Sequence, residues 1–224
     1  MPRISTELTS WALNSVLVLS LGLLLLVIRP VTAATPALLT DLALVEVLRN
    51  GGYNIYFRHV STDWSQSDGL RQADDWLSCD PAQMRQLSEP GRADAVAIGD
   101  AIRSLEIPVG EILASPYCRT VETARLMKLG EVTATTEVMN LRAAEYFGGR
   151  AAIVATARAL LARSPRPGTN RIIVAHGNVA QASTPVYPAE GEGVVFRPDG
   201  NDGFYLVGRI NPTDWSRLLN LAIQ

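Results

Sequence analysis

The sequence has little histidine, cysteine and lysine. Its 224 residues include two histidines and two cysteines, and Lys128 is the only lysine, so arginine carries nearly all of the positive charge. The net charge is −2 and no basic block is present, which argues against a nucleic-acid partner. No cluster of histidine, cysteine and aspartate has the spacing of a zinc site, so the residues by themselves indicate no metal site.

The N-terminal segment lacks charge over a long stretch. Residues 8–28 are uncharged and largely aliphatic, and small residues follow at Val31-Thr32-Ala33. This pattern is typical of a secretory signal peptide, and the stretch is also long enough for a membrane anchor. We therefore expect residues 1–33 to be a signal peptide or an anchor, residues 34–40 to be a linker, and residues 41–224 to form one domain. If the signal is cleaved, the domain is in the periplasm or is secreted. If it is not cleaved, the N-terminal segment anchors the domain to the membrane.

The pattern of apolar residues predicts an α/β protein. Helices alternate with short apolar strands, which is typical of a mainly parallel central sheet covered on both faces, a three-layer α/β/α sandwich. The turn chemistry of residues 198–203 predicts a final hairpin that adds an antiparallel edge. A polar stretch without a period, residues 60–83, is expected to be a long loop. We expect helices at 41–49, from 88, 117–127, 149–163 and from 212, and strands at 53–58, 112–114, 132–136, 171–175, 194–197 and 204–210.

Both histidines stand where a predicted strand ends. Arg58-His59 closes the first strand, and His176 follows the strand at 171–175 and precedes a turn. A third strand end leads through Ser115-Pro116 to Arg119 at the start of a helix. Ligands of open α/β sheets bind at the carboxyl ends of the strands, and arginine forks suit phosphate oxygens. We therefore expect a compact cationic site for a phosphoryl group.

In this arrangement the sequence resembles the histidine phosphatase superfamily, the phosphoglycerate-mutase-like proteins. The resemblance covers about residues 40–210, with the motifs in the family's order. Arg58-His59-Val60 stands where the family has Arg-His-Gly, and residues 87–95 match Leu-Ser/Thr-x-x-Gly-x-x-x-Ala. Residues 115–124 match Ser-Pro-x-x-Arg-x-x-x-Thr-Ala, and His176-Gly177 matches the last strand end. The N-terminal segment and the cysteine pair resemble the exported, periplasmic branch.

The resemblance implies a role for each matched residue. His59 would be the nucleophile that forms a phosphohistidine, and Arg58, Arg119 and His176 would bind the phosphoryl oxygens. Thr62 and Gly177 would add further contacts to the phosphate. The implied activity is metal-independent hydrolysis of a small phosphorylated substrate, a phosphoric monoester, and it implies no cofactor.

Two departures from the family pattern concern Val60 and the proton donor. Val60 replaces the usual glycine, so its φ must be negative to avoid strain. The family's usual donor is a glutamate shortly after a Leu-Arg-like pair, but Leu141-Arg142 is followed by alanine. Glu145 is the first acid after that pair and Glu192 is the second candidate.

Three readings of function remain open at this point. A phosphatase would release phosphate, a phosphoglycerate-mutase-type transferase would return it to the substrate, and a non-catalytic module would only bind phosphate. The two cysteines, Cys79 and Cys118, are expected to form a disulfide if the domain is exported, and otherwise to be two buried thiols.

Overall fold

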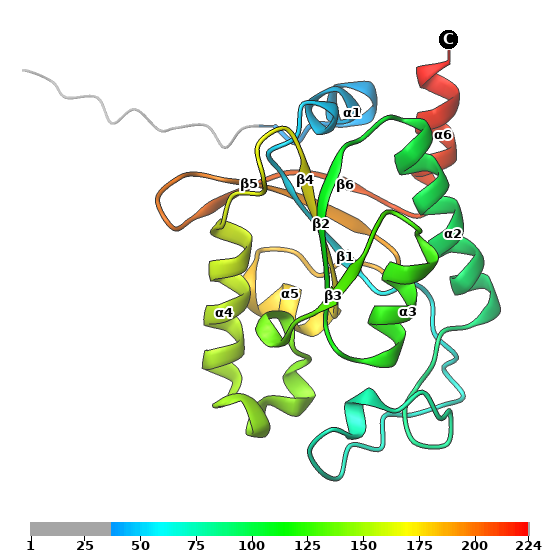
Figure 1. The fold of residues 1–224 in the computed structure, drawn as a ribbon, viewed down its shortest axis with the longest axis vertical. Helices are drawn as coiled ribbons and strands as arrows, with labels where there is room; N and C mark the ends of the chain where they lie inside the picture. Colours follow the sequence, from blue (N-terminus) through cyan, green and yellow to red (C-terminus); the bar gives the residue numbers. More distant parts are fainter. Residues whose placement is uncertain (1–36, 224) are drawn as a thin grey trace, which may run out of the picture. The chain divides into compact units, whose positions relative to one another are not determined.

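The computed structural model describes residues 37–223, drawn as a coloured ribbon in Figure 1. The expected signal or anchor, residues 1–33, lies outside the described residues, and the expected linker is described only from residue 37. Within residues 37–223, no helix has the length and apolar character needed to cross a membrane.

Six strands form one sheet at the centre of the domain. Its order is β3-β2-β4-β1-β5-β6, in which β3, β2, β4 and β1 pair in parallel. Strand β5 pairs antiparallel with β1, and β6 pairs antiparallel with β5. This confirms the mainly parallel sheet with an antiparallel hairpin at one edge. The strands are β1 (Asn54–Arg58), β2 (Val109–Ala114), β3 (Val132–Ala134), β4 (Asn170–Ala175), β5 (Gly193–Pro198) and β6 (Phe204–Ile210).

Alternate residues of the central strands enter two separate hydrophobic cores. Ile55 and Phe57 on β1 pack into one core, whereas Tyr56 between them packs into the other. Successive side chains of a strand point to opposite faces of its sheet, so a wholly apolar strand needs cover on both faces. The cover is supplied by α1 (Asp41–Arg49), α2 (Glu89–Ser104), α3 (Cys118–Leu126) and α6 (Asp214–Ala222) on one face and by α4 (Arg150–Ala162) and α5 (Gly177–Ser183) on the other.

Figure 1 shows α4 and α5 on one side of the sheet and α2, α3 and α6 on the other, which is the expected three-layer sandwich. One short segment differs from the sequence-based expectation, because the chain after His176 forms α5 rather than a turn. The segment Leu141–Phe147, for which no helix or strand is predicted, forms a 3-10 helix, η3. Two shorter 3-10 turns are η1 (Asp75–Leu77) and η2 (Thr136–Val138).

The start of α2 fixes the chain that follows β1. Ser88 caps the helix by accepting the N–H of Gly91 at 3.1 Å. A Cβ atom on Gly91 would lie 2.1 Å from the carbonyl oxygen of Ser61, so only glycine allows this approach. The Ser88 N–H also donates to the Ser61 carbonyl at 3.0 Å. The chain that follows Arg58-His59-Val60 is therefore held against the start of the motif at residues 87–95. This contact positions the loop that begins after His59.

Candidate active site

Parallel pairing of β1, β4 and β2 brings three strand ends together. Arg58 pairs with Ala175, and Ala114 pairs with Val174, so His59, His176 and Ser115 follow at the same edge of the sheet. The imidazole centroids of His59 and His176 are 5.7 Å apart. The structure therefore places the two histidines side by side, as expected from their positions at strand ends.

A pocket of about 230 Å³ opens at this edge. It brings together the two histidines, the two arginines of the motifs and Gly177. Further residues come from the long loop and from the segments that follow β3 and β4. The full lining is Arg58, His59, Trp64, Asp68, Arg85, Arg119, Asn140, Arg142, His176, Gly177, Asn178 and Tyr187.

His59 is held in one tautomer. The residue is 3% exposed, and its Nδ1 lies 2.9 Å from the carbonyl oxygen of Val60. A carbonyl oxygen can only accept, so Nδ1 carries the proton and Nε2 keeps its lone pair. Burial lowers the pKa of His59 well below the usual value, and the charges of Arg119 and Arg58 lower it further. The ring is therefore neutral and nucleophilic at pH 7. Val60 does not take a positive φ, as predicted.

His176 presents a free ring nitrogen inside the domain. Its Nε2 lies 2.9 Å from Oγ of Ser115, while its Nδ1 is buried and has no hydrogen-bond partner among the described residues. Burial lowers the pKa of His176 well below its usual value, and Arg119 adds to this shift. If the Ser115 hydroxyl donates to Nε2, then Nδ1 carries the proton and can donate to a ligand oxygen.

Arg119 is bound to an acid that the motifs did not indicate. Its Nη1 and Nη2 donate to the two carboxylate oxygens of Asp68 at 2.9 and 3.0 Å, and both side chains are buried. Nη1 also donates to the carbonyl of Arg85 at 3.3 Å, whereas Nε is buried without a partner among residues 37–223. The guanidinium lies over the ring of Tyr117, 4.7 Å from its centroid. Aromatic and carboxylate contacts thus hold it rigidly in the pocket.

Arg58 has its own carboxylate partner. Its Nη2 donates to Oε1 of Glu190 at 3.2 Å, and Nη1 donates to the Pro188 carbonyl at 3.2 Å. The same Oε1 accepts the hydroxyl of Thr62 at 3.0 Å. Thr62 is thereby committed to Glu190 and does not line the pocket, so its expected contact with phosphate has no support in this geometry.

Neither expected proton donor is brought to the pocket. Glu145 is exposed on η3 and is absent from the lining. Glu192 is buried, but its two oxygens accept the guanidinium of Arg209 at 2.5 and 2.9 Å, and Oε2 also accepts the N–H of Ala189 at 2.8 Å. The geometry therefore does not support either residue as the donor.

Several lining residues had not been identified from the sequence. Asp68 and Arg85 belong to or follow the long loop, where no periodicity marks a residue for a site. In the sequence, Arg142 stands out only as part of the Leu-Arg pair that lacks the following glutamate. The remaining polar ones are Asn140 and Tyr187, whereas Asn178 belongs to the strand end that begins with His176. Loops carry much of a protein's binding chemistry, but their side chains are placed by contacts that sequence spacing does not reveal.

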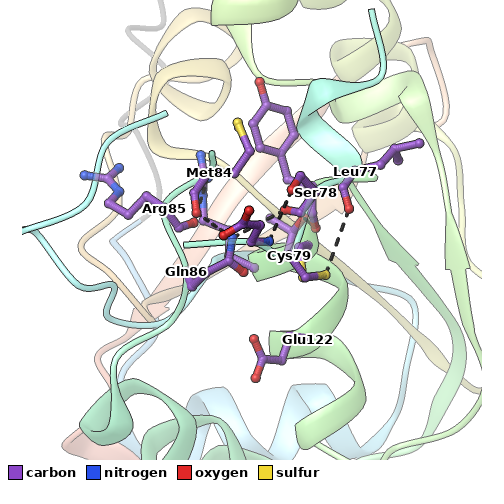
Figure 2. The surroundings of a disulfide bond; sticks show 12 residues. Leu77, Ser78, Cys79, Met84, Arg85, Gln86 and Glu122 are labelled. Carbon is purple, nitrogen blue, oxygen red and sulfur yellow. Dashed lines mark hydrogen bonds between the residues drawn. A yellow bond between two sulfur atoms is a disulfide. The ribbon is translucent and has the colours of Figure 1, made fainter. Parts of the chain in front are cut away.

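The expected disulfide between Cys79 and Cys118 is present, with Cα atoms 5.4 Å apart. Figure 2 shows Cys79 beside Leu77 and Ser78, with Arg85 and Gln86 of the same loop near it. Because Arg119 follows Cys118 directly, the bond ties the arginine segment to the loop that carries Asp68. A larger groove of about 1210 Å³ runs along the disulfide. That groove shares only Trp64 with the histidine pocket and contains neither histidine.

Metal-binding geometry is not found in the described part of the chain. Among residues 37–223, no group of three or more histidine, cysteine, aspartate or glutamate side chains is arranged to hold a metal ion. The chemistry that these residues offer is that of a neutral imidazole between guanidinium groups.

Comparison with solved structures identifies the fold. Protein histidine phosphatase SixA in complex with tungstate matches with a TM-score of 0.50 and 12% identity, over 72% of this chain and 98% of that one. Mycobacterial hydrolase 1 matches with a TM-score of 0.50 and 17% identity, over 72% and 100%. A phosphoserine phosphatase from Entamoeba histolytica, bound to phosphoserine, matches with a TM-score of 0.48 and 14% identity, over 71% and 97%.

Sequence comparison adds no closer relative. No family model matches the chain, and the search of curated proteins finds no significant match. At these low identities the structural similarity establishes the fold, and the ordered motifs occupy the expected strand ends within it. The chain therefore has the phosphoglycerate-mutase-like fold of the histidine phosphatases, as its motifs predict.

Proposed function

We propose that this protein is a metal-independent phosphomonoester hydrolase that forms a phosphohistidine at His59 from a small phosphorylated substrate. The observation that carries this proposal is the state of His59. It is a buried, neutral imidazole with its Nδ1 proton fixed on the Val60 carbonyl, in a pocket that also contains Arg58, Arg119 and His176. A neutral imidazole is a competent nucleophile toward phosphorus.

In the first step, Nε2 of His59 attacks phosphorus and the bond to the substrate oxygen breaks. Arg58 and Arg119 bind the equatorial oxygens, over which the charge of the transition state is spread. The buried Nδ1 of His176 is suited to donate a further hydrogen bond to one of these oxygens. In the second step, water attacks the phosphohistidine, which releases inorganic phosphate and restores neutral His59.

The comparisons support this proposal at the level of fold. Among the solved structures with this fold are proteins described as a protein histidine phosphatase and a phosphoserine phosphatase. The first is a complex with tungstate, an oxyanion. A pocket with four arginines in its lining suits the same kind of ligand. We expect loop residues to determine which substrate is bound, because loops supply the part of the lining away from the histidines.

We further propose that the domain works outside the cytoplasm. The uncharged stretch of residues 8–28 is typical of an export signal, and a structural disulfide persists in oxidising compartments. Expression of the full chain with cell fractionation tests this proposal. We expect the protein in the periplasm, in the medium or on the membrane. Recovery in the cytoplasm with two reduced cysteines would refute it.

Radioactive labelling tests the enzymatic proposal directly. Brief incubation with a ³²P-labelled monoester, followed by rapid denaturation at alkaline pH, should leave an acid-labile label on the wild-type protein. His59→Ala should give no label and no turnover, whereas His176→Ala should retain slow labelling, because its ring is assigned to binding. Near wild-type turnover by His59→Ala contradicts the mechanism.

The same assay separates the other two activities. A mutase-type transferase would return the phosphoryl group to the substrate and need a bisphosphate, whereas the proposed hydrolase releases inorganic phosphate without one. A binding module would bind phosphate without labelling. Circular dichroism of each variant shows whether the fold is kept.

A further inference from the structure

Asp68 occupies the two terminal nitrogens of Arg119 and leaves its Nε without a partner among the described residues. Both terminal nitrogens of the guanidinium donate to the Asp68 carboxylate, at 2.9 and 3.0 Å. The Asp68 side chain is 4% exposed and that of Arg119 is 2% exposed, so solvent does not screen this pair. A bidentate carboxylate and a bidentate phosphate use the same fork of donors. A phosphate therefore competes with Asp68 for the two terminal nitrogens and binds both of them only when Asp68 leaves.

Asp68 is also the only carboxylic acid among the described residues that line the pocket. Glu190, which binds Arg58, does not belong to the lining, and the two expected donors lie elsewhere. An alkoxide leaving group needs a proton, and a positioned acid accelerates such a step by roughly a hundredfold to ten-thousandfold. Asp68 is thus the one acid in this lining that could protonate the leaving group.

The Asp68 segment is held by two contacts that do not involve the guanidinium of Arg119. The N–H of the next residue, Gly69, donates to the Gln83 carbonyl at 2.8 Å. Oδ1 of Asp68 accepts the N–H of Arg85 at 3.2 Å, which gives the carboxyl group a second anchor beside the fork. A displaced carboxyl group therefore stays in the pocket, next to the phosphoryl group that displaced it.

We propose that Asp68 is the proton donor of the reaction and that substrate binding itself causes its carboxylate to become protonated. This inference rests on the proposed phosphatase function. When the substrate phosphate takes the fork of Arg119, Asp68 loses its cationic partner and faces a dianion. Both changes favour the protonated carboxylic acid, which takes its proton from solvent or from a monoanionic substrate.

The proton balance of the two steps is complete with Asp68 alone. As Nε2 of His59 bonds to phosphorus, the P–O bond to the substrate breaks, and the leaving oxygen takes the Asp68 proton to become an alcohol. The Asp68 carboxylate then takes a proton from the attacking water, whose oxygen bonds to phosphorus as the P–N bond breaks. The products are the alcohol, inorganic phosphate, neutral His59 and protonated Asp68, which loses its proton when phosphate departs and Arg119 is rebound.

The variant Asp68→Asn separates this role from a structural one, because it keeps the shape of the side chain and removes the charge and the acid. Titration calorimetry should show inorganic phosphate binding several-fold more tightly to the variant, since the internal competitor for Arg119 is lost. With glycerol 3-phosphate, kcat should fall by a hundredfold or more. With p-nitrophenyl phosphate, whose leaving group needs little protonation, it should fall less than tenfold.

The matched control is Asp74→Asn. Asp74 is an exposed residue of the same loop with a φ of 70°, a conformation that asparagine tolerates well. It should leave the ratio of the two substrate rates and the phosphate affinity unchanged. The ratio does not depend on how much of a preparation is folded, so partial unfolding of Asp68→Asn cannot imitate the result.

Two outcomes would overturn the assignment. Equal slowing of both substrates by Asp68→Asn, or selectivity that appears in Glu145→Gln, Glu190→Gln or Glu192→Gln instead, would remove Asp68 from the donor role. A wild-type protein that hydrolyses neither substrate and takes no label at His59 would refute the proposed function instead. In that case tighter phosphate binding by Asp68→Asn would still show that its carboxylate competes for Arg119.

Discussion

The hydroxyl group of Tyr56 on β1 hydrogen-bonds to both main-chain polar groups of His176 on the neighbouring strand end. It accepts the N–H of His176 at 3.1 Å and donates to its carbonyl oxygen at 2.8 Å. Burial raises the pKa of Tyr56, so the hydroxyl keeps its proton. Tyr56, from the core that α4 and α5 cover, thereby fixes the backbone of His176 at the edge of the pocket.

Tyr56→Phe should therefore affect both stability and turnover. It leaves the buried N–H of His176 unsatisfied, while the His176 carbonyl keeps the N–H of Ala180 at 3.2 Å, and an unsatisfied buried group costs about 1–3 kcal/mol in the free energy of unfolding. Turnover should also fall, because His176 loses its support, while labelling of His59 persists. Urea denaturation and steady-state kinetics measure the two effects. Tyr205→Phe, at an exposed position on β6, is the control and should change neither. Unchanged stability in Tyr56→Phe would contradict this account.

The free energy of unfolding should depend on pH through the two histidines. The folded-state pKa values of His59 and His176 are lowered well below the usual 6.5, so the unfolded chain binds more protons as the pH falls. The contribution of the two histidines to the free energy of unfolding is fully present above about pH 6.5. It is lost below that value, by up to about 1.4 kcal/mol per pH unit for each histidine.

Because the chain has only two histidines, the origin of this slope can be isolated. Urea denaturation between pH 7.5 and 5.5 measures it, and the double variant His59→Gln, His176→Gln should lose most of the slope in this range. A slope that survives in the double variant would assign the effect to other groups.

Reduction of the disulfide should lower stability and weaken phosphate binding together. Cys79 and Cys118 are 39 positions apart. By the chain-entropy model, closing a loop of this size contributes about 3–4 kcal/mol. Its loss should loosen Arg119, the residue after Cys118. The melting temperature and the phosphate affinity of the double variant Cys79→Ser, Cys118→Ser should both fall, and added reductant should then have no further effect. Two free thiols in intact-mass analysis of protein from an oxidising compartment would contradict the bond.

Arg142 should favour substrates with a second anionic group. In the described part of the chain neither Arg142 nor Arg85 forms an ion pair, although both line the pocket. Arg85 lies 4.0 Å from the Trp64 ring centroid, and burial and Arg119 lower its pKa. A ligand carboxylate or phosphate near the rim would neutralise these charges.

Paired substrates test this preference. The kcat/KM for 3-phosphoglycerate should exceed that for glycerol 3-phosphate, and Arg142→Gln should reduce this ratio about tenfold. Arg150→Gln, an exposed arginine outside the pocket, should leave the ratio as it is. A ratio near one in the wild type would show that the substrate carries no second anion.

Much of the fold followed from the sequence because the signals were local. Wholly apolar strands predict a sheet covered on both faces, and Ser88 followed by Pro90 predicts the start of α2, which the structure confirms. The ordered motifs predicted which residues share the sheet edge, since parallel strands place their carboxyl ends together. The helix after His176 was missed, because its seven residues have little apolar periodicity.

By itself the sequence determined the α/β class, the convergence of His59, His176, Arg58 and Arg119, and the expected cysteine pair. Each of these depends on where the strands end along the chain or on residue type. Only the tertiary structure decided that Asp68 binds Arg119 and that Glu192 binds Arg209. Such pairings depend on how loops without periodicity cross one another, and a buried charge takes whichever partner the packed chain brings within reach.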